Sequence, residues 1–350
     1  MDRSALDAFS HQHRLARPAV AAALTLSGAQ PDAAAWRAFA ASLLHAAGLG
    51  AIGAGVLFFV AANWQDYGVF GRFALLQAAL LACVAVALWR PPPARAGQAA
   101  MVLATLLAGG LLALFGQSYQ TGADLHELFF TWALLTLPFA LAGLSGALWA
   151  VWWTVLNIAL ALLCGWLGPD HFFWRFVDGR HLDHAVLLML PCVVNLLGAA
   201  AFVALRRTRW SSAAPTWLLR GLASAAFAYG TAAVIAVVLH GHRDRPVDAA
   251  AAAGGARAAV VLLFAAICVA LALATWRHRR DVFPMALIAA SGIAISTTWL
   301  GHTMRLNDVG AFFLIAAWLV GSSTASGLLL MRWVRTWRDG PATTPDGDAA

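Results

Sequence analysis

Ten apolar runs, each long enough to cross a lipid bilayer, recur along almost the whole chain of 350 residues. A hydrocarbon core of about 30 Å requires roughly 17 to 25 apolar residues in a helix. The runs cover residues 43–62, 73–89, 99–115, 128–144, 147–167, 185–205, 218–239, 258–276, 282–300 and 310–331. Helices of this length pair all their backbone N–H and C=O groups internally, as a bilayer demands. The runs therefore predict an all-α, polytopic transmembrane helix bundle with about ten membrane-spanning helices.

The composition agrees with this prediction. Hydrophobic residues make up 61% of the chain and charged residues 11%, whereas a soluble domain carries about 25% charged residues. We expect residues 1–42 to form a cytoplasmic or interfacial segment, 43–331 the bundle and 332–350 a disordered cytoplasmic tail. In the first segment Asp32, directly after Pro31, is a predicted helix N-cap. Only Ser145 and Gly146 separate the fourth run from the fifth, so these two runs could form either one broken span or two.

The basic residues indicate an orientation. All 23 of them are Arg. If the N-terminus is inside, sixteen lie in cytoplasmic loops and tails and seven on the opposite side. This asymmetry follows the positive-inside rule and predicts that both termini are cytoplasmic. No basic stripe with interleaved aromatic residues exists outside the loops, so we expect the lipid bilayer and no nucleic acid as a partner.

Polar residues gather at two places that this topology assigns to the outer, periplasmic face. One group closes the first run, and the other lies between the third and fourth runs, where Gly122 predicts a turn. Together they predict a site for a ligand or a partner, formed by Asn63, Asp66, Gln117, Tyr119, Gln120, Asp124 and Glu127. We expect the turn at 117–127 to lie against the segment 63–67. The alternative is that these residues only cap helix ends at the membrane interface.

The same stretches carry a family resemblance. The residues concerned are Gly53, Phe58, Phe59, Asn63, Trp64, Phe70, Gly71 and Arg72, then Gly116, Gln117, Tyr119, Gln120, Thr121, Gly122, Ala123, Asp124, Glu127, Leu128, Phe129, Trp132 and Pro138. Over residues 36–144 the chain resembles domain-of-unknown-function family 2157, a group of predicted bacterial membrane proteins. The resemblance implies a multi-pass protein of the bacterial cytoplasmic (inner) membrane. It also implies a partnership with a neighbouring membrane protein that has a Gly-Asp-Tyr motif, but it implies no activity.

Motifs for catalysis or metal binding are not recognisable. The sequence has no Gly-x-Ser-x-Gly elbow, phosphate loop or His-Glu-x-x-His pair. The histidines and aspartates of one outer loop do not have the spacing of an established metal site: Asp170, His171, His181, Asp183 and His184. We therefore predict no catalytic residue, no metal and no cofactor.

The middle of every run lacks Asp, Glu and Arg, which disfavours proton-coupled transport through a buried carboxylate. Asn195, four residues after Pro191, could form a packing hydrogen bond or line a cavity, and packing is the favoured alternative. The sequence thus favours a non-enzymatic binding or partner-holding subunit of a membrane complex, with its polar site on the periplasmic face. The alternatives are a facilitator or transporter of a small polar solute and a membrane enzyme that acts on lipid or envelope precursors.

Overall fold

The structure is a computed structural model that describes residues 16–26, 32–119, 122, 124–165, 182–205, 215–239, 247–276, 281–304 and 309–338. Within these ranges the chain forms eleven helices and no strand. The predicted all-α fold is therefore confirmed. The chain divides into two compact units, Met1–Ala74 and Leu75–Ala350, and each is described by itself.

The first unit contains α2 (Arg17–Leu26), α3 (Ala33–Ala62) and the beginning of α4 (Val69–Trp89). The backbone N–H of Ala35 donates a hydrogen bond of 2.6 Å to Asp32 Oδ1. This bond satisfies one of the N–H groups that the first turn of a helix leaves without a partner. The predicted N-cap is confirmed, and α3 begins ahead of the predicted run 43–62 and includes all of it.

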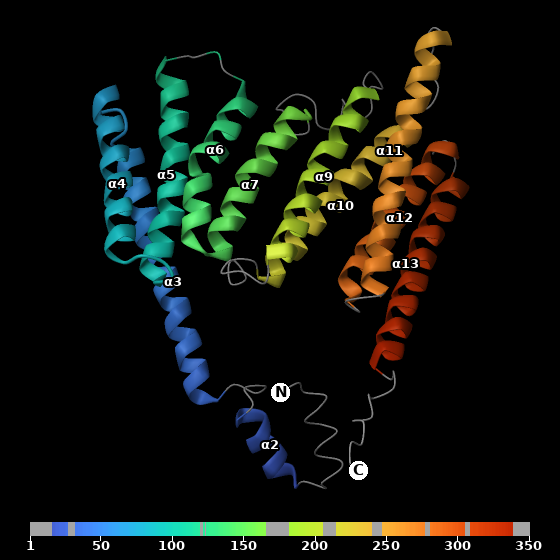
Figure 1. Ribbon diagram of the computed structural model, residues 1–350, viewed down its shortest axis with the longest axis horizontal. Coiled ribbons are helices and arrows are strands. Elements are labelled where there is room, and N and C mark those ends of the chain that lie inside the picture. Colours follow the sequence, from blue (N-terminus) through green and yellow to red (C-terminus); the bar gives the residue numbers. More distant parts are fainter. Residues whose placement is uncertain are drawn as a thin grey trace, which may run out of the picture. The chain divides into compact units, whose positions relative to one another are not determined.

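The second unit continues α4 and adds the remaining helices. These are α5 (Arg95–Tyr119), α6 (Leu125–Gly143), α7 (Gly146–Leu163), α9 (Leu182–Ala204), α10 (Thr216–Leu239), α11 (Val247–Ala274), α12 (Val282–Thr303) and α13 (Val309–Arg338). Helix α5 packs on α6, α6 on α7, and α7 on α9 (Figure 1). Helix α10 in turn packs along α9 and α12, and α13 packs on α12. The last helix extends beyond the predicted run 310–331 to Arg338.

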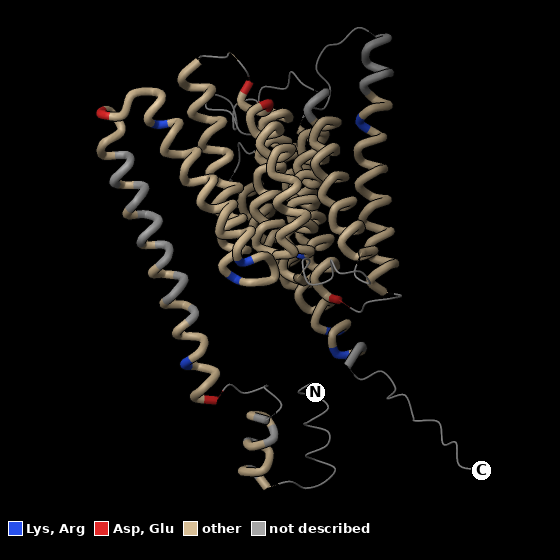
Figure 2. The backbone as a smooth tube through the Cα atoms, turned by 60° about the vertical axis from the view of Figure 1, so that its left-hand side comes forward, with Lys and Arg blue, Asp and Glu red and all other residues tan. Residues whose placement is uncertain are grey.

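In the part of the chain that the structure describes, nine helices are long and apolar enough to cross a membrane, namely α4 to α7 and α9 to α13. They correspond to nine of the ten predicted runs, which confirms a polytopic membrane protein. Charged residues lie toward the ends of these helices, and the middle of each is uncharged (Figure 2). The remaining run, 43–62, lies within α3. Its crossing of the membrane stays a prediction, as does the orientation of the termini.

The break between the fourth and fifth runs is a true helix boundary. Leu144 has a left-handed backbone (φ 47°, ψ 36°), and Ser145 is extended (φ −124°, ψ 130°). A left-handed residue ends an α-helix because it turns the following backbone away from the helix axis. Helices α6 and α7 are consequently separate and pack against each other, so the question that the sequence left open is answered in favour of two spans.

Aromatic side chains fill the space among α7, α9 and α10. Trp149 and Trp153 of α7 lie in a buried cluster with Phe202 of α9, and the rings of Trp149 and Phe202 have centroids 5.0 Å apart. A Cβ atom at Gly198 of α9 would clash with the ring of Trp153. Close packing of this kind holds membrane helices together, because lipid tails are as apolar as the helix surfaces themselves.

Candidate functional site

The first part of the predicted outer-face cluster lies in the link between α3 and α4. Asn63 is half-buried and Asp66 is exposed, and the backbone N–H of Asp66 donates to the carbonyl of Asn63 over 3.1 Å. Arg72 donates from Nε and Nη2 to the carbonyl of Trp64, at 3.0 and 2.6 Å. Its guanidinium also lies 4.6 Å from the centre of the Trp64 ring. Arg72 therefore holds this link in place.

The second part lies between α5 and α6. Gln117 and Tyr119 are exposed residues of the last turn of α5, where the ring of Tyr119 lies 4.9 Å from that of Phe115. Gly122 has a positive φ of 63°, a conformation that favours glycine, and it lies between the end of α5 and the start of α6. Asp124 directly precedes α6, and Glu127 is in its first turn. Gln120 lies outside the described residues.

The carboxylates of this turn are not used for capping. Asp124 occupies the N-cap position of α6 with an extended backbone (φ −64°, ψ 147°), but its side chain makes no capping hydrogen bond. Both Asp124 and Glu127 are exposed, and neither side chain forms a hydrogen bond or an ion pair with another described residue. The turn therefore presents two carboxylates that the described part of the fold does not engage.

The two parts of the cluster belong to different compact units. Asn63 and Asp66 lie in Met1–Ala74, whereas Gln117, Tyr119, Asp124 and Glu127 lie in Leu75–Ala350. The expected contact of the 117–127 turn with the segment 63–67, and hence a single pocket, stays a prediction.

A second polar group lies inside the second unit, where Asn157 of α7 faces Asn195 of α9. Asn195 Nδ2 donates to Asn157 Oδ1 over 2.7 Å, and Asn157 Nδ2 donates to Asn195 Oδ1 over 3.0 Å. Each amide also donates one turn back along its own helix, Asn157 to the carbonyl of Trp153 and Asn195 to that of Pro191, both at 2.8 Å. All N–H groups of both side chains are therefore paired, and Asn195, which is 0% exposed, is a packing residue.

Helices α9 and α10 complete this interior network. Pro191 has no N–H, so the carbonyl of Leu187, four residues earlier, lacks its helical partner. Cys164 at the end of α7 donates from Sγ to this carbonyl over 3.4 Å. Tyr229 of α10 donates from its hydroxyl to the carbonyl of Asn157 over 3.2 Å. The polar groups that hold α7, α9 and α10 together thus satisfy one another.

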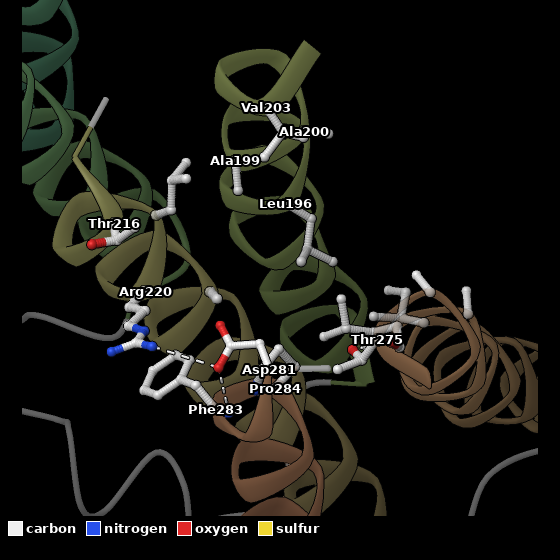
Figure 3. A pocket seen from close by; sticks show the side chains of 16 residues that line it. Leu196, Ala199, Ala200, Val203, Thr216, Arg220, Thr275, Asp281, Phe283 and Pro284 are labelled. Atoms are coloured by element: carbon white, nitrogen blue, oxygen red, sulfur yellow. Dashed lines mark hydrogen bonds and ion pairs between the residues drawn. The ribbon is translucent and has the colours of Figure 1, made fainter. Parts of the chain in front are cut away.

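A pocket of about 720 Å³ lies among α9, α10, α11 and the beginning of α12 (Figure 3). Most of its lining is apolar, and its charged residues are Arg220 of α10 and Asp281, which caps α12. Arg220 Nη2 lies 3.5 Å from Asp281 Oδ1. Arg220 is one of the sixteen arginines that the sequence predicts to be cytoplasmic. Because Arg220 is the third residue of the apolar run 218–239, the sequence also indicates that it lies at a helix end beside neighbouring helices.

The loop histidines give no metal site to describe. Asp170, His171 and His181 lie outside the described residues, and the side chains of Asp183 and His184 are likewise not described. Over the ranges that the structure does describe, no three His, Cys, Asp or Glu residues come together as metal ligands would.

Residues 7–149 match the family model described as predicted membrane protein (DUF2157). This match confirms the resemblance found in the sequence. It extends from before α2 to the first turn of α7 and includes every residue of the predicted outer-face cluster, whereas Asn157, Asn195 and the pocket lie beyond it. No curated protein and no solved structure matches the chain. The chain is thus a multi-pass integral membrane protein, and the description of the DUF2157 family does not state a function.

Proposed function

We propose that this protein is a non-enzymatic, partner-holding subunit of a membrane complex and that the turn between α5 and α6 is part of its binding surface. The observation that carries the proposal is the state of Asp124 and Glu127. Both carboxylates are exposed and without a partner among the described residues. Residues with only a capping role would donate or accept within their own helix end, and Asp124 does not.

The interior of the second unit supports binding over transport. In the described part of the chain no charged residue is fully buried, although Nε of the half-buried Arg257 on α11 is enclosed, and the buried polar residues are Thr105, Thr136, Asn195, Thr275 and Ser291. Ion and proton pathways are normally marked by charged groups at membrane depth. At the level of Asn157 and Asn195 the amides are already paired with each other. Among the described residues of α7, α9 and α10, the buried polar atoms without a hydrogen bond are the indole N–H groups of Trp149 and Trp153, which are uncharged donors and give an ion or a proton no charged group to follow.

Carboxylate and amide groups suit a partner that offers N–H or O–H donors near the membrane interface. The resemblance implies a neighbouring membrane protein with a Gly-Asp-Tyr motif, whose backbone N–H groups and tyrosine hydroxyl are donors of this kind. We place the contact on the periplasmic face of the bacterial inner membrane, because the distribution of arginines assigns the α5–α6 turn to that side.

Reporter fusions test this orientation. Fusions after Arg95, Arg209 and Arg280 are expected to report the cytoplasm, and those near Asp124 and Asn307 the periplasm. A cytoplasmic signal at Asp124 would place the turn on the wrong side for the proposed contact.

The proposal is tested by purifying the tagged full-length chain from its native membrane and identifying stoichiometric membrane subunits by mass spectrometry. We expect a second membrane protein with the wild type and its loss with the triple variant Gln117→Ala, Asp124→Asn, Glu127→Gln, at unchanged yield. The control is His302→Ala, which changes an exposed polar residue at the end of α12 and should retain the partner.

Two results would contradict the proposal. The same subunit at the same stoichiometry in the triple variant would exclude the turn as a binding surface. Solute flux through vesicles that contain this chain alone would instead support the facilitator alternative, and turnover of a lipid or envelope precursor that depends on Asp124 or Glu127 would support the enzyme.

A further inference from the structure

The pocket among α9, α10, α11 and α12 has apolar walls that include several alanines. Ala199 and Ala200 of α9, Ala223 of α10, and Ala270 and Ala274 of α11 border it. Larger apolar side chains, among them Leu196, Leu219 and Ile267, complete the walls around these alanines. Together they leave about 720 Å³, within the range of about 300 to 1,000 Å³ that is usual for small-molecule sites. The apolar walls suit a hydrocarbon chain.

One end of the pocket is polar and charged. Arg220 Nη2 and the backbone N–H of Phe283 both donate to Asp281 Oδ1, at 3.5 and 3.1 Å. The Arg220 guanidinium also lies 5.2 Å from the centre of the Phe283 ring. Figure 3 shows Arg220 and Asp281 turned toward each other at this end.

Arg220 has capacity for another acceptor. A guanidinium has five N–H donors, and among the described residues it makes one long hydrogen bond, to Asp281. The Arg220 side chain is 53% exposed and that of Asp281 is 40% exposed, so an incoming group can reach both. A planar guanidinium is well suited to bind a phosphate with two parallel hydrogen bonds.

The surrounding sequence is basic. The segment that joins α9 to α10 contains Arg206, Arg207 and Arg209, and the segment that joins α11 to α12 contains Arg277, Arg279 and Arg280. Both segments connect the helix ends near Arg220 and Asp281, which the topology predicts to be cytoplasmic. Basic pockets between membrane helices on that side attract the head groups of anionic lipids.

We propose that this pocket binds an anionic phospholipid, with an acyl chain between α9 and α11 and the head-group phosphate on Arg220. Asp281 competes with the phosphate for the guanidinium. The site is independent of the proposed partner surface at the α5–α6 turn. A free phosphate would leave the apolar walls uncovered, and a neutral lipid would not use the charge of Arg220, so the combination favours an anionic lipid.

The test is a lipid titration of the full-length chain in detergent, with bound lipid measured by native mass spectrometry. The probes are phosphatidylglycerol, phosphatidylcholine with the same acyl chains, and inorganic phosphate. We expect phosphatidylglycerol to bind most tightly. Arg220→Gln should weaken it roughly tenfold, because a charge-assisted hydrogen bond is lost.

The variant Asp281→Asn gives the opposite expectation. Asparagine caps a helix about as well as aspartate, so α12 keeps its N-cap, but the competing charge is removed. The affinity for phosphatidylglycerol should therefore rise. If Arg220 and Asp281 only stabilised the fold, both substitutions would change lipid binding in the same direction or not at all.

A steric pair of variants completes the test. Ala270→Leu fills the pocket and should weaken phosphatidylglycerol, whereas Ala265→Leu adds the same volume at an exposed position of α11 outside the pocket and should not. Should Ala270→Leu fail to fold, the opposite shifts of Arg220→Gln and Asp281→Asn still decide the matter. Equal affinities for the two lipids, or binding of inorganic phosphate as tight as that of the lipid, would overturn the proposal.

Discussion

The two polar groups of this protein, the turn between α5 and α6 and the amide pair between α7 and α9, use similar side chains in opposite ways. At the turn, Asp124 and Glu127 are exposed and make no bond to a described residue. In the interior, Asn157 and Asn195 use all their N–H groups on each other and on their own helices.

This difference distinguishes polar residues that stabilise the bundle from polar residues that can bind a partner. An amide without a partner inside a protein costs about 1 to 3 kcal/mol, so buried polar groups persist where they are paired. Exposed polar groups at a helix end are solvated by water and cost nothing comparable. The interior pair is thus part of what holds the bundle together, and the turn remains available for a partner.

Substitutions in the interior should lower the free energy of unfolding more than substitutions at the turn. The largest loss is expected where a larger side chain has no room. Gly198→Leu places a side chain against the Trp153 ring, and overpacking of this kind typically costs about 1 to 3 kcal/mol. The measurement is the free energy of unfolding of the full chain in mixed micelles. Gly292→Leu is the control, because a Cβ there meets nothing within 4 Å. Equal losses in the two variants would show that α7 and α9 are not closely packed.

A double-mutant cycle measures the amide pair itself. Asn195→Ala should destabilise the bundle because it leaves the Asn157 side chain without its partner, and the double variant Asn157→Ala, Asn195→Ala should lose less than the sum of the single variants. Interhelical hydrogen bonds in membrane proteins are worth about 0.6 kcal/mol on average and up to about 1.7, and we expect a coupling energy in this range. Strict additivity would mean that the two amides do not interact.

The turn should give the smallest effect on stability. The triple variant Gln117→Ala, Asp124→Asn, Glu127→Gln changes exposed side chains, and such substitutions usually stay within about 0.5 kcal/mol. Unfolding measured under the same conditions as for the interior variants checks this. A loss as large as that of Asn195→Ala would indicate that the turn has a structural role after all.

Much of the fold could be predicted because it depends on local signals. Apolar runs predicted nine of the described helices, Asp32 predicted the start of α3, and Gly122, which has a positive φ, lies between α5 and α6. The separation of α6 from α7 was harder to predict, because the residue with the left-handed backbone is Leu144, a residue type that does not favour this conformation. The glycines on either side are the last residue of α6, Gly143, and the first of α7, Gly146.

The interior and the pocket could not be predicted, because they depend on how distant helices are positioned. The two asparagines are 38 residues apart in the sequence. Their pairing depends on how α7 and α9 are rotated about their axes and shifted along them relative to each other. Arg220 and Asp281 are 61 residues apart, and the pocket beside them depends on how α9, α10, α11 and α12 are positioned. In the candidate site, the sequence could not show that the Asp124 side chain makes no capping hydrogen bond, because its position directly before α6 is that of an ordinary N-cap.

The central claim, that the α5–α6 turn holds a protein partner, is tested most directly by site-specific photo-crosslinking in the native membrane. A photoreactive phenylalanine analogue is placed at Tyr119, which is 56% exposed, and, as a control on a lipid-like surface, at Phe313 of α13, which is 67% exposed. The account predicts a discrete cross-linked product between Tyr119 and one other membrane protein, which is absent at Phe313 and is lost in the variant Gln117→Ala, Asp124→Asn, Glu127→Gln. Products with lipid alone at both positions would contradict it.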